Sequence, residues 1–353
     1  MALTTSPHPR HADIRGRLAA TWSATLAAGL ALLGGCAPAA PPAPTAAAPG
    51  QALTKVVAAY AAPVPNVLPE WIAKDAGIFE KNGLDVEFQT IQTANLGAAL
   101  LSGQVHITSG GSPEAINAST TGADLIFLTV NVNIFPWKFY ARPEIKQIQD
   151  LKGKKIGITT AGAPYDVGLR IVLPEKGLIP DTDVTLVPAG SIPNVTAALV
   201  SGGIDGAALV VGPDSEKAIQ QGMHELFDFA DLNVAYPTSA VIARRSWVAQ
   251  NRATVQKYVD SIVEAIAREK SDKPYTMSVM RKNLGITDEQ ALSKIYDYFT
   301  QRAVPSQPFP RPEIFTAMLA SLGQTSERVR GVDIKTLLDP SFVQSAIDRG
   351  VDK

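Results

Sequence analysis

The chain repeats part of its own sequence once. The stretch NLGAALLSG at residues 95–103 returns as NVTAALVSG at residues 194–202. Upstream of these stretches, EKNGL in the first copy matches EKGL in the second, and the strand-like segments KVVAAY and KKIGIT open the two copies. Because the repeated unit is long and occurs only twice, the sequence predicts two similar lobes and not a solenoid of short repeats.

Each copy alternates strand and helix three times. In the first copy the patterns predict strands at residues 55–61, 85–91 and 105–110, and helices at 68–83, 94–103 and 113–122. The second copy follows the same order between residues 154 and 222. Strands that alternate with helices predict a mostly parallel sheet with right-handed crossovers. The expected fold class is therefore α/β, with two similar lobes.

Two segments rich in strand formers are predicted to cross between the lobes. Residues 125–142, LIFLTVNVNIFPWKFYAR, lead from the first lobe to the second, and residues 235–248, AYPTSAVIARRSWV, lead back. These crossings predict a first lobe that is built from two pieces and a second lobe that is continuous. The predicted bounds are 53–140 and 241–353 for the first lobe, and 141–240 for the second.

The C-terminal part of the chain is predicted to be helical and to pack on the first lobe. One of its helices has an apolar face at helical spacing, formed by Val255, Tyr258, Val259, Ile262, Val263 and Ile266. Thr287 and Gln290 predict a capping box at the start of a later helix.

The N-terminal segment is predicted to be a targeting signal. Basic residues precede an apolar run at residues 18–33, which is too short to span a bilayer as a helix, since about 20 residues are needed. Leu33-Gly34-Gly35-Cys36 then resembles a lipoprotein lipobox, with Cys36 as the lipidated residue. We therefore expect a signal peptide at 1–35 and an Ala/Pro-rich linker at 36–52 that tethers the protein to a membrane. The alternative is an ordinary secretory signal with an incidental cysteine.

Charge and motif content exclude several functional classes. The chain has 32 Lys and Arg residues against 33 Asp and Glu, so no nucleic-acid surface is indicated. Cys36 is the only cysteine, which excludes an intramolecular disulfide. No metal-ligand constellation, P-loop or nucleophile elbow follows a predicted strand, so neither a metal nor a cofactor is expected. His106 is interpreted as a sheet residue and not as a general base.

The turns after the predicted strands share one chemistry. Gly, Ser, Thr, Asn and Pro recur in them, as in SGGSPE at residues 109–114 and TTAGAPYD at 159–166. Ligands of open parallel sheets bind beyond the carboxyl ends of the strands. Helices that begin at such turns leave free N–H groups that face a ligand. Any one of these turns has an ordinary capping explanation, but six such turns on paired lobes predict a ligand cleft.

Three stretches carry a family resemblance. WIAKDAGIFEKNGLDVEF, LLSGQVHITSGGSPEAI and DLKGKKIGITTAGAP resemble the periplasmic solute-binding proteins of ABC importers, in the branch that takes nitrate, aliphatic sulfonates, taurine or thiamine pyrimidine precursors. The resemblance covers residues 53–270 and implies a type II periplasmic-binding-protein-like fold, in which mixed, mostly parallel sheets are joined by two crossover strands and the ligand lies in the cleft.

The resemblance, carried over by position, implies a set of ligand-binding residues. They are Asn66, Gln92, Thr93, Ser109, Gly110, Gly111, Ser112, Trp137, Thr160, Gly162, Ala163, Tyr165, Asp166, Gly212, Asp214 and Tyr236. The aromatic members can stack on a planar ligand or pack between the lobes. None of the six turns contains Arg or Lys, which favours a small neutral or zwitterionic organic ligand, or a monoanionic sulfonate.

The expected function is an extracytoplasmic solute-binding lipoprotein of an ABC importer. It would capture a small organic ligand of sulfonate, nitrate or pyrimidine-precursor type by hinge closure, as a monomer without catalytic residues. Its expected partners are a permease with its ATPase and the membrane that holds the lipid on Cys36. Two alternatives stay open: an enzyme of the same fold that acts on a small aromatic or pyrimidine-like metabolite, and a sensor that presents its ligand state to a membrane receptor.

Overall fold

The computed structural model describes residues 52–353. The predictions of a signal peptide and of lipidation at Cys36 lie outside the described residues. Within residues 52–353, no helix is long and apolar enough to cross a membrane.

The first sheet has the strand order β2-β1-β3-β10-β4. Its strands are β1 (Thr54–Tyr60), β2 (Leu84–Thr90), β3 (Ile107–Ser109), β4 (Leu125–Ile134) and β10 (Ala235–Arg244). β1 pairs in parallel with β2 and β3, whereas β10 runs antiparallel to β3 and β4. The sheet is therefore mixed, with its parallel part made by the first copy of the repeat.

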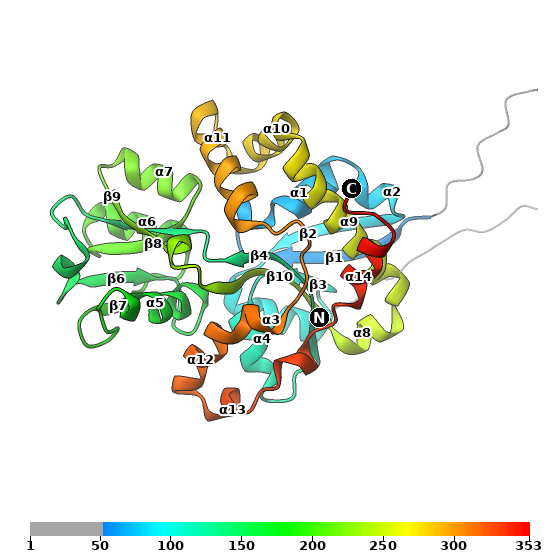
Figure 1. Ribbon diagram of the computed structural model, residues 1–353, viewed down its shortest axis with the longest axis horizontal. Helices are drawn as coiled ribbons and strands as arrows, with labels where there is room; N and C mark the ends of the chain where they lie inside the picture. The colour runs from blue at the N-terminus through cyan, green and yellow to red at the C-terminus, as the bar shows by residue number, and fades with distance from the viewer. Residues whose placement is uncertain (1–51) are drawn as a thin grey trace, which may run out of the picture. The chain divides into compact units, whose positions relative to one another are not determined.

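The second sheet has the strand order β7-β6-β8-β5-β9. Its strands are β5 (Trp137–Ala141), β6 (Lys155–Ile158), β7 (Thr185–Pro188), β8 (Gly206–Val210) and β9 (His224–Asp228). β6 pairs in parallel with β7 and β8, and β5 is antiparallel to β8 and β9. Each sheet thus has the same plan, and its antiparallel strand, β10 or β5, comes from one of the two segments that connect the sheets. Figure 1 shows the two sheets next to each other.

The two predicted crossing segments behave differently in the structure. The segment at 125–142 is divided between the sheets, because β4 pairs in the first sheet and β5 in the second. The return segment forms β10 and α8 (Arg245–Gln250). We call the first sheet with the helices packed on it the first lobe, and the second sheet with its helices the second lobe. The residue bounds predicted for the lobes stay a prediction.

The helices of the two copies correspond in order. In the first copy they are η1 (Pro65–Val67), α1 (Leu68–Asp75), α2 (Ile78–Lys81), α3 (Thr93–Ser102) and α4 (Ser112–Ser119). In the second copy they are α5 (Pro164–Glu175), α6 (Ile192–Ser201) and α7 (Pro213–Gln220). The 3₁₀ turn η2 (Ile148–Leu151) precedes β6, and the 3₁₀ turn η3 (Phe229–Leu232) follows β9. α3 and α6 hold the repeated NxxAAL stretches. Both end on a left-handed glycine, Gly103 at φ 81° and Gly202 at φ 83°, where a side chain would be strained.

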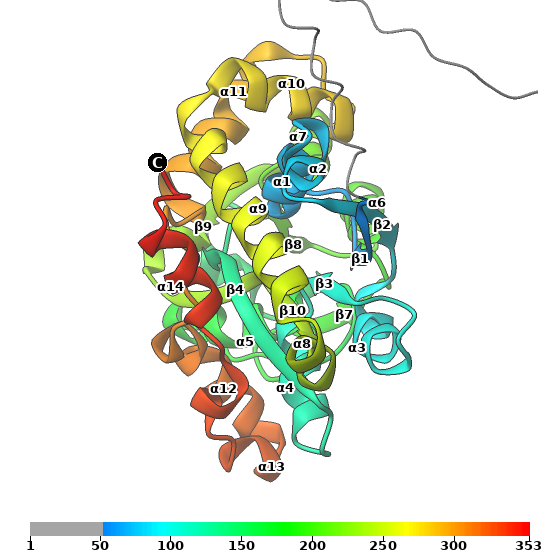
Figure 2. The ribbon, with the colours of Figure 1, turned by 90° about the vertical axis from the view of Figure 1, so that its right-hand side faces the viewer.

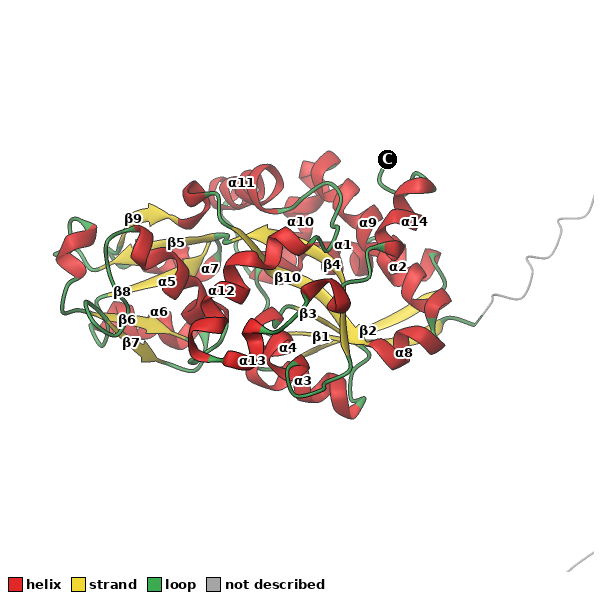
Figure 3. Ribbon diagram, turned by 60° about the horizontal axis from the view of Figure 1, so that its bottom comes forward, coloured by secondary structure: helices red, strands yellow, loops and turns green. Residues whose placement is uncertain are grey.

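The C-terminal part of the chain is helical, as predicted. Its elements are α9 (Arg252–Ser271), α10 (Lys273–Leu284), α11 (Glu289–Tyr298), the π-helical turn η4 (Phe299–Ala303), η5 (Pro312–Phe315), α12 (Thr316–Thr325), α13 (Glu327–Arg330), η6 (Ile334–Leu337) and α14 (Ser341–Asp348). The predicted apolar face of α9 is fully buried. α9 packs on α1, β2 and α14 (Figure 2). α12, however, also packs on α5 of the second lobe, so the C-terminal part contacts both lobes. Figure 3 shows the strands of the second sheet gathered apart from those of the first.

Candidate functional site

A cleft lies between the lobes, at the turns that follow the parallel strands. Its outer part has a volume of about 280 Å³ and is lined from the first lobe by Ala61, Ala62, Pro63, Gln92, Thr93 and Ala94. From the second lobe it is lined by Thr159, Thr160, Pro164, Tyr165, Gly190, Ser191, Ile192 and Pro193. An inner part of about 80 Å³ shares six of these residues and adds Val64, Asn66, Val67, Ser109, Gly110, Gly111, Trp137, Thr238 and Ser239. We call the two parts together the interlobe cleft.

The backbone conformation after β3 explains why two glycines stand there. Gly110 and Gly111 both adopt left-handed backbone angles, with φ of 99° and 77°, which side chains rarely adopt. A Cβ atom on Gly111 would lie 3.4 Å from a methyl carbon of Leu96, whereas one on Gly110 would meet no atom within 4 Å. The backbone at Gly110 therefore borders open space, and the turn presents main chain to the cleft.

The inner wall of the cleft is a fixed pair of aromatic rings. Trp137 stacks on Tyr165 with ring centroids 4.4 Å apart and planes 14° apart. A Cβ atom on Gly168 would lie 2.3 Å from the Trp137 ring, so the indole packs directly on the backbone of α5. Tyr236 stacks on Phe135 behind this wall, with centroids 4.1 Å apart. These contacts fix a flat surface against which a planar or apolar group can pack.

Three buried polar atoms at the inner part have no hydrogen-bond partner among residues 52–353. They are Oδ1 of Asn66, Nε1 of Trp137 and Oγ of Ser239. Nearby hydroxyls are satisfied, since Thr238 Oγ1 donates to the carbonyl of Ile134 at 2.5 Å. Buried polar atoms in folded proteins nearly always have a partner. An acceptor, a donor and a hydroxyl on three residues that line one small cavity are therefore candidate partners for a bound polar molecule.

The lining of the cleft carries no charged side chain, since none of its residues is Lys, Arg, His, Asp or Glu. Carboxyl groups lie close behind it. Burial raises the pKa of Glu114 to about 7, and its Oε2 atom has no partner among the described residues. Burial also raises the pKa of Asp214, which a hydrogen bond from Thr196 partly offsets. Asp166 accepts from Arg170 at 2.9 Å and from the backbone of Gly162 at 2.7 Å. A ligand in the cleft therefore meets hydroxyl, amide, indole and backbone groups.

The structure brings nine of the predicted site residues together. These are Asn66, Gln92, Thr93, Ser109, Gly110, Gly111, Trp137, Thr160 and Tyr165, which all line the interlobe cleft. They come from five different strand ends and from both lobes. The prediction that the turns after the strands converge agrees with this geometry, although ligand contact by each residue stays a prediction.

The other seven predicted residues lie behind the lining. Ser112 is buried, and its hydroxyl donates to the carbonyl of Pro237 at 2.8 Å. Tyr236 is fully buried against Phe135. Gly212 packs near Pro65 of the opposite lobe, where an added Cβ atom would lie 3.3 Å from the proline ring. Its N–H donates to Ser215 Oγ at 3.0 Å. The remaining members of this group are Gly162, Ala163, Asp166 and Asp214.

Several lining residues were not among the predicted ones. Thr238 and Ser239 lie within β10, which reads in sequence as a buried strand. The pairing of β10 with β4 is irregular on both sides of Ser239. No sequence pattern predicts that irregularity. Ser191 and Ile192 lie in the turn PAGSIPN at residues 188–194, and Ala62, Pro63 and Val64 lie in the turn APVPNVLP at residues 62–69. The recurrence of turn chemistry could have identified them.

Two other predicted features can be compared with the structure. His106 lies outside the cleft: its Nδ1 accepts from the N–H of Val57 at 2.9 Å, and its ring stacks on Trp247. His106 lies in a bend directly before β3, and its N–H donates to the carbonyl of Val57 on β1, so its contacts agree with a structural role beside the sheet. Residues 52–353 hold no group of three or more His, Cys, Asp or Glu side chains that could bind a metal ion.

A larger groove of about 420 Å³ lies elsewhere, between α7 and the α10–α11 region. Charged residues contribute to its lining, among them Glu216, Lys217 and Lys294. None of its lining residues has an unpartnered buried polar atom. We therefore place the candidate ligand site in the smaller interlobe cleft, whose inner part is lined by residues that carry such atoms.

Comparison with known proteins agrees with this geometry. The family model described as "NMT1/THI5 like" matches residues 64–270, which is more than half of the chain. A binding protein of Brucella abortus (strain 2308), whose name gives no ligand, is 30% identical over 210 residues. That match covers 55% of this chain and 60% of the relative, so the chain spans less than two thirds of the relative's length.

Solved structures show the fold. The periplasmic aliphatic sulphonate binding protein SsuA from Escherichia coli superposes with a TM-score of 0.66 at 22% identity, over 83% of this chain and 93% of that one. The desulfurization enzyme DSZB superposes with a TM-score of 0.61 at 18% identity, over 84% of this chain and 99% of that one. The predicted two-lobed α/β fold of periplasmic binding proteins is confirmed, and at these identities the likeness concerns the fold alone.

Proposed function

Because the chain belongs to the NMT1/THI5-like family, we propose that it is an extracytoplasmic solute-binding protein of an ABC importer. One observation supports this proposal most strongly. Three residues that line a small cavity between the two lobes, Asn66, Trp137 and Ser239, each carry a buried polar atom without a partner among the described residues. A cavity with a few convergent polar groups and an aromatic wall is the usual form of a small-molecule site.

The proposed mechanism is closure of the two lobes on the ligand. The outer cleft draws its lining about equally from both lobes, so a bound molecule would contact both. A ligand that contacts both lobes at once favours the closed conformation by its additional contacts there. The two connections between the sheets, from β4 to β5 and from η3 to β10, are the natural hinge. A permease with its ATPase would then recognise the closed form.

The proposed ligand is a small organic molecule. The uncharged lining supports a neutral or zwitterionic compound, or a monoanion such as a sulfonate that backbone N–H groups can bind. The flat Trp137–Tyr165 wall suits a planar or apolar portion of that molecule. SsuA is named for aliphatic sulphonates, and a sulfonate-, nitrate- or pyrimidine-precursor-like ligand is the corresponding proposal for this chain.

The proposed location follows from the leader sequence. A short apolar run that ends at Leu33-Gly34-Gly35-Cys36 supports signal cleavage and lipid attachment at Cys36. Two or more acyl chains would give stable anchoring. The Ala/Pro-rich linker would then hold a monomeric binding unit at the outer side of the membrane.

An enzyme is the alternative, because DSZB has the same fold. General acid–base or nucleophilic catalysis needs a titratable or activated group within reach of the substrate. The cleft lining holds no histidine, lysine or carboxylate. The hydroxyl of Ser109 donates to Glu70 at 2.5 Å, but that carboxyl group is fully buried and does not line the cleft. This composition favours binding over catalysis. A sensor role would use the same cleft and would differ only in the membrane partner.

Native mass spectrometry of the protein purified without unfolding tests the proposal. We expect one small organic molecule per chain. The variant Thr93→Trp should lose it, because Thr93 lines both parts of the cleft. Thr182→Trp is the matched control, since Thr182 is exposed and distant from the lining. Equal occupancy in Thr93→Trp and the unaltered protein would contradict a site in the cleft.

A further inference from the structure

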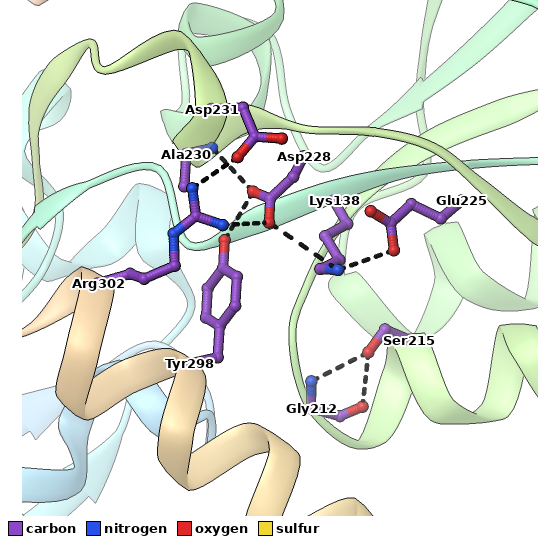
Figure 4. A network of polar contacts seen from close by, with 9 residues as sticks. All are labelled: Lys138, Gly212, Ser215, Glu225, Asp228, Ala230, Asp231, Tyr298 and Arg302. Atoms are coloured by element: carbon purple, nitrogen blue, oxygen red, sulfur yellow. Dashed lines mark hydrogen bonds and ion pairs between the residues drawn. The ribbon is translucent and has the colours of Figure 1, made fainter.

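A cluster of charged side chains connects the lobes outside the cleft lining (Figure 4). Its members from the second lobe are Lys138 of β5, Glu225 and Asp228 of β9, and Asp231 of η3; those from the C-terminal part are Tyr298 of α11 and Arg302 of η4. We call this set the hinge cluster. η4 packs on β4 of the first sheet, so the last two members extend from the first lobe to the second.

Asp228 is the centre of the hinge cluster. The carboxylate is buried. Its Oδ1 atom accepts from the hydroxyl of Tyr298 and from the N–H of Ala230, both at 2.8 Å, and its Oδ2 atom accepts from Arg302 Nη1 at 3.1 Å. A buried carboxylate needs such partners to remain charged. Two of these three donors come from the C-terminal part, so the carboxylate is fully satisfied only when the lobes are in this arrangement.

Arg302 contacts the segment that returns to the first sheet. Its second guanidinium nitrogen donates to Asp231 at 2.6 Å, and η3, which holds Asp231, leads directly into β10. One planar guanidinium therefore binds two carboxylates on either side of this turn. Burial and the neighbouring Asp228 raise the pKa of Tyr298, so its hydroxyl stays protonated and donates.

Lys138 connects the hinge cluster to the wall of the cleft. Its ammonium group lies 2.8 Å from Glu225 and 3.9 Å from Asp228. Lys138 follows Trp137 on β5, and Trp137 lines the inner part of the cleft. The hinge cluster therefore restrains the strand that carries the aromatic wall, although none of its members lines the cleft.

We infer that Tyr298 and Arg302 are positioning residues, which hold the second lobe at its angle to the first and so set the width of the ligand cleft. Contacts that exist in one arrangement of two lobes stabilise that arrangement over others. Because they lie away from the lining, these residues act on ligand affinity through the lobe angle alone. The significance for ligand binding rests on the proposed function, whereas the lobe angle can be measured without a ligand.

Distances between spin labels on the two lobes test this inference. The full chain with Cys36→Ser would carry labels at Glu87→Cys in the first lobe and Glu175→Cys in the second, both of which are exposed sites. Double electron–electron resonance then gives the interlobe distance distribution. We expect Arg302→Met to lengthen the mean distance and broaden the distribution, and Tyr298→Phe to do so to a smaller degree. Arg302→Lys should restore part of the difference.

Arg349→Met is the matched control. Arg349 binds Asp260 through two nitrogens at 2.8 and 2.6 Å, and both residues belong to the C-terminal part packed on the first lobe. This variant removes an Arg–Asp pair without touching the second lobe and should leave the distribution unchanged. An unchanged or shortened distance in Arg302→Met overturns the inference. If that variant does not fold, an unchanged distribution in Tyr298→Phe overturns it. Failure to find a ligand by mass spectrometry would affect only the proposed function.

Discussion

The interlobe cleft and the hinge cluster are both polar regions between the same two lobes, but their hydrogen bonding differs. In the hinge cluster, both oxygens of Asp228 have donors from within the chain. In the cleft, polar atoms of Asn66, Trp137 and Ser239 have none among the described residues. The hinge cluster is charged, whereas the cleft lining is not.

This difference separates a structural contact from a binding surface. Charged groups that satisfy one another contribute to the arrangement of the lobes, because separating them leaves a buried charge without a partner. Buried polar atoms without hydrogen-bond partners lower stability unless a bound molecule provides those partners. The comparison therefore predicts that substitutions at the hinge cluster lower stability and change the lobe angle, while loss of an unpartnered cleft atom weakens ligand binding without lowering stability.

The largest effect on the free energy of unfolding is expected at Trp137, which lines the cleft and is also part of the hydrophobic core. Trp137 is 1% exposed and packs on Tyr165 and Gly168. Trp137→Ala should lower the free energy of unfolding by about 3–5 kcal/mol, as other buried aromatic truncations do. Urea denaturation measures this loss. Trp247→Ala, at a half-buried tryptophan outside the cleft, is the control and should cost clearly less. Equal losses of unfolding free energy in the two variants would show that the Trp137–Tyr165 wall is not rigidly packed.

A second large effect concerns unpartnered polar atoms that are not at a cavity. Glu269 is fully buried and neither of its carboxyl oxygens has a partner among the described residues. Burial raises its pKa from 4.5 to about 8, partly offset by Lys270. The folded chain thus retains a proton that the unfolded chain releases. Its contribution to stability is complete below about pH 4.5 and is lost as the pH rises through about 8.

Glu269→Gln should remove this pH dependence. The free energy of unfolding of the unaltered protein should fall from about pH 5 to about pH 8.5, whereas that of the variant should not fall on account of this site. The difference between the two proteins should therefore shift in favour of the variant by on the order of 3 kcal/mol, since each pKa unit corresponds to about 1.4 kcal/mol. Thermal unfolding at the two pH values measures the difference. A variant whose stability follows that of the unaltered protein across this range would contradict a raised pKa at this site.

A smaller effect is expected from the partnered hydroxyl of the hinge cluster. Tyr298 donates to a buried carboxylate at 2.8 Å. Tyr298→Phe removes that bond and should lower the free energy of unfolding by about 1.5 kcal/mol, because hydrogen bonds to charged groups contribute this much. Denaturant titration gives the value. An unchanged free energy of unfolding would show that the Tyr298–Asp228 hydrogen bond contributes nothing measurable to stability.

The smallest effect is expected from the unpartnered hydroxyl of the cleft. Ser239 is buried, yet its Oγ atom makes no hydrogen bond to residues 52–353. Ser239→Ala removes no hydrogen bond within the chain and should therefore not lower the free energy of unfolding. Ligand affinity should still fall, which isothermal titration with the co-purified molecule would detect. If Ser239→Ala lowered the free energy of unfolding as much as Tyr298→Phe, the interlobe cleft and the hinge cluster would not differ in their contribution to stability.

The fold was largely predictable because the repeat constrains it. One alternating unit used twice implies two equivalent sheets, and their strand orders agree strand for strand. Local detail was less predictable. The single helix expected at residues 68–83 is broken by Gly77, which takes a left-handed φ of 67° between α1 and α2. The capping box predicted at Thr287 and Gln290 is wrong, because Asp288 caps α11 and accepts from the N–H of Ala291 at 2.8 Å.

The candidate site was predictable only as far as turn chemistry extends. Residues in strand-to-helix turns, such as Asn66, Thr93 and Gly110, do line the cleft. Ser239 was missed because a strand irregularity, which depends on pairing with β4, brings it there. Ser112 lies behind the lining, because its hydroxyl donates to the carbonyl of Pro237; ligand contact at Ser112 stays a prediction. Long-range pairing of this kind is not encoded in local sequence.

Hydrogen–deuterium exchange with and without the co-purified molecule tests the central claim most directly. We predict slower exchange upon binding at residues 61–67, 92–94, 109–111, 159–165 and 190–193, the turns of both lobes that line or adjoin the cleft. Protection on only one lobe, or confined to the groove between α7 and α10–α11, would contradict capture of a ligand between the lobes.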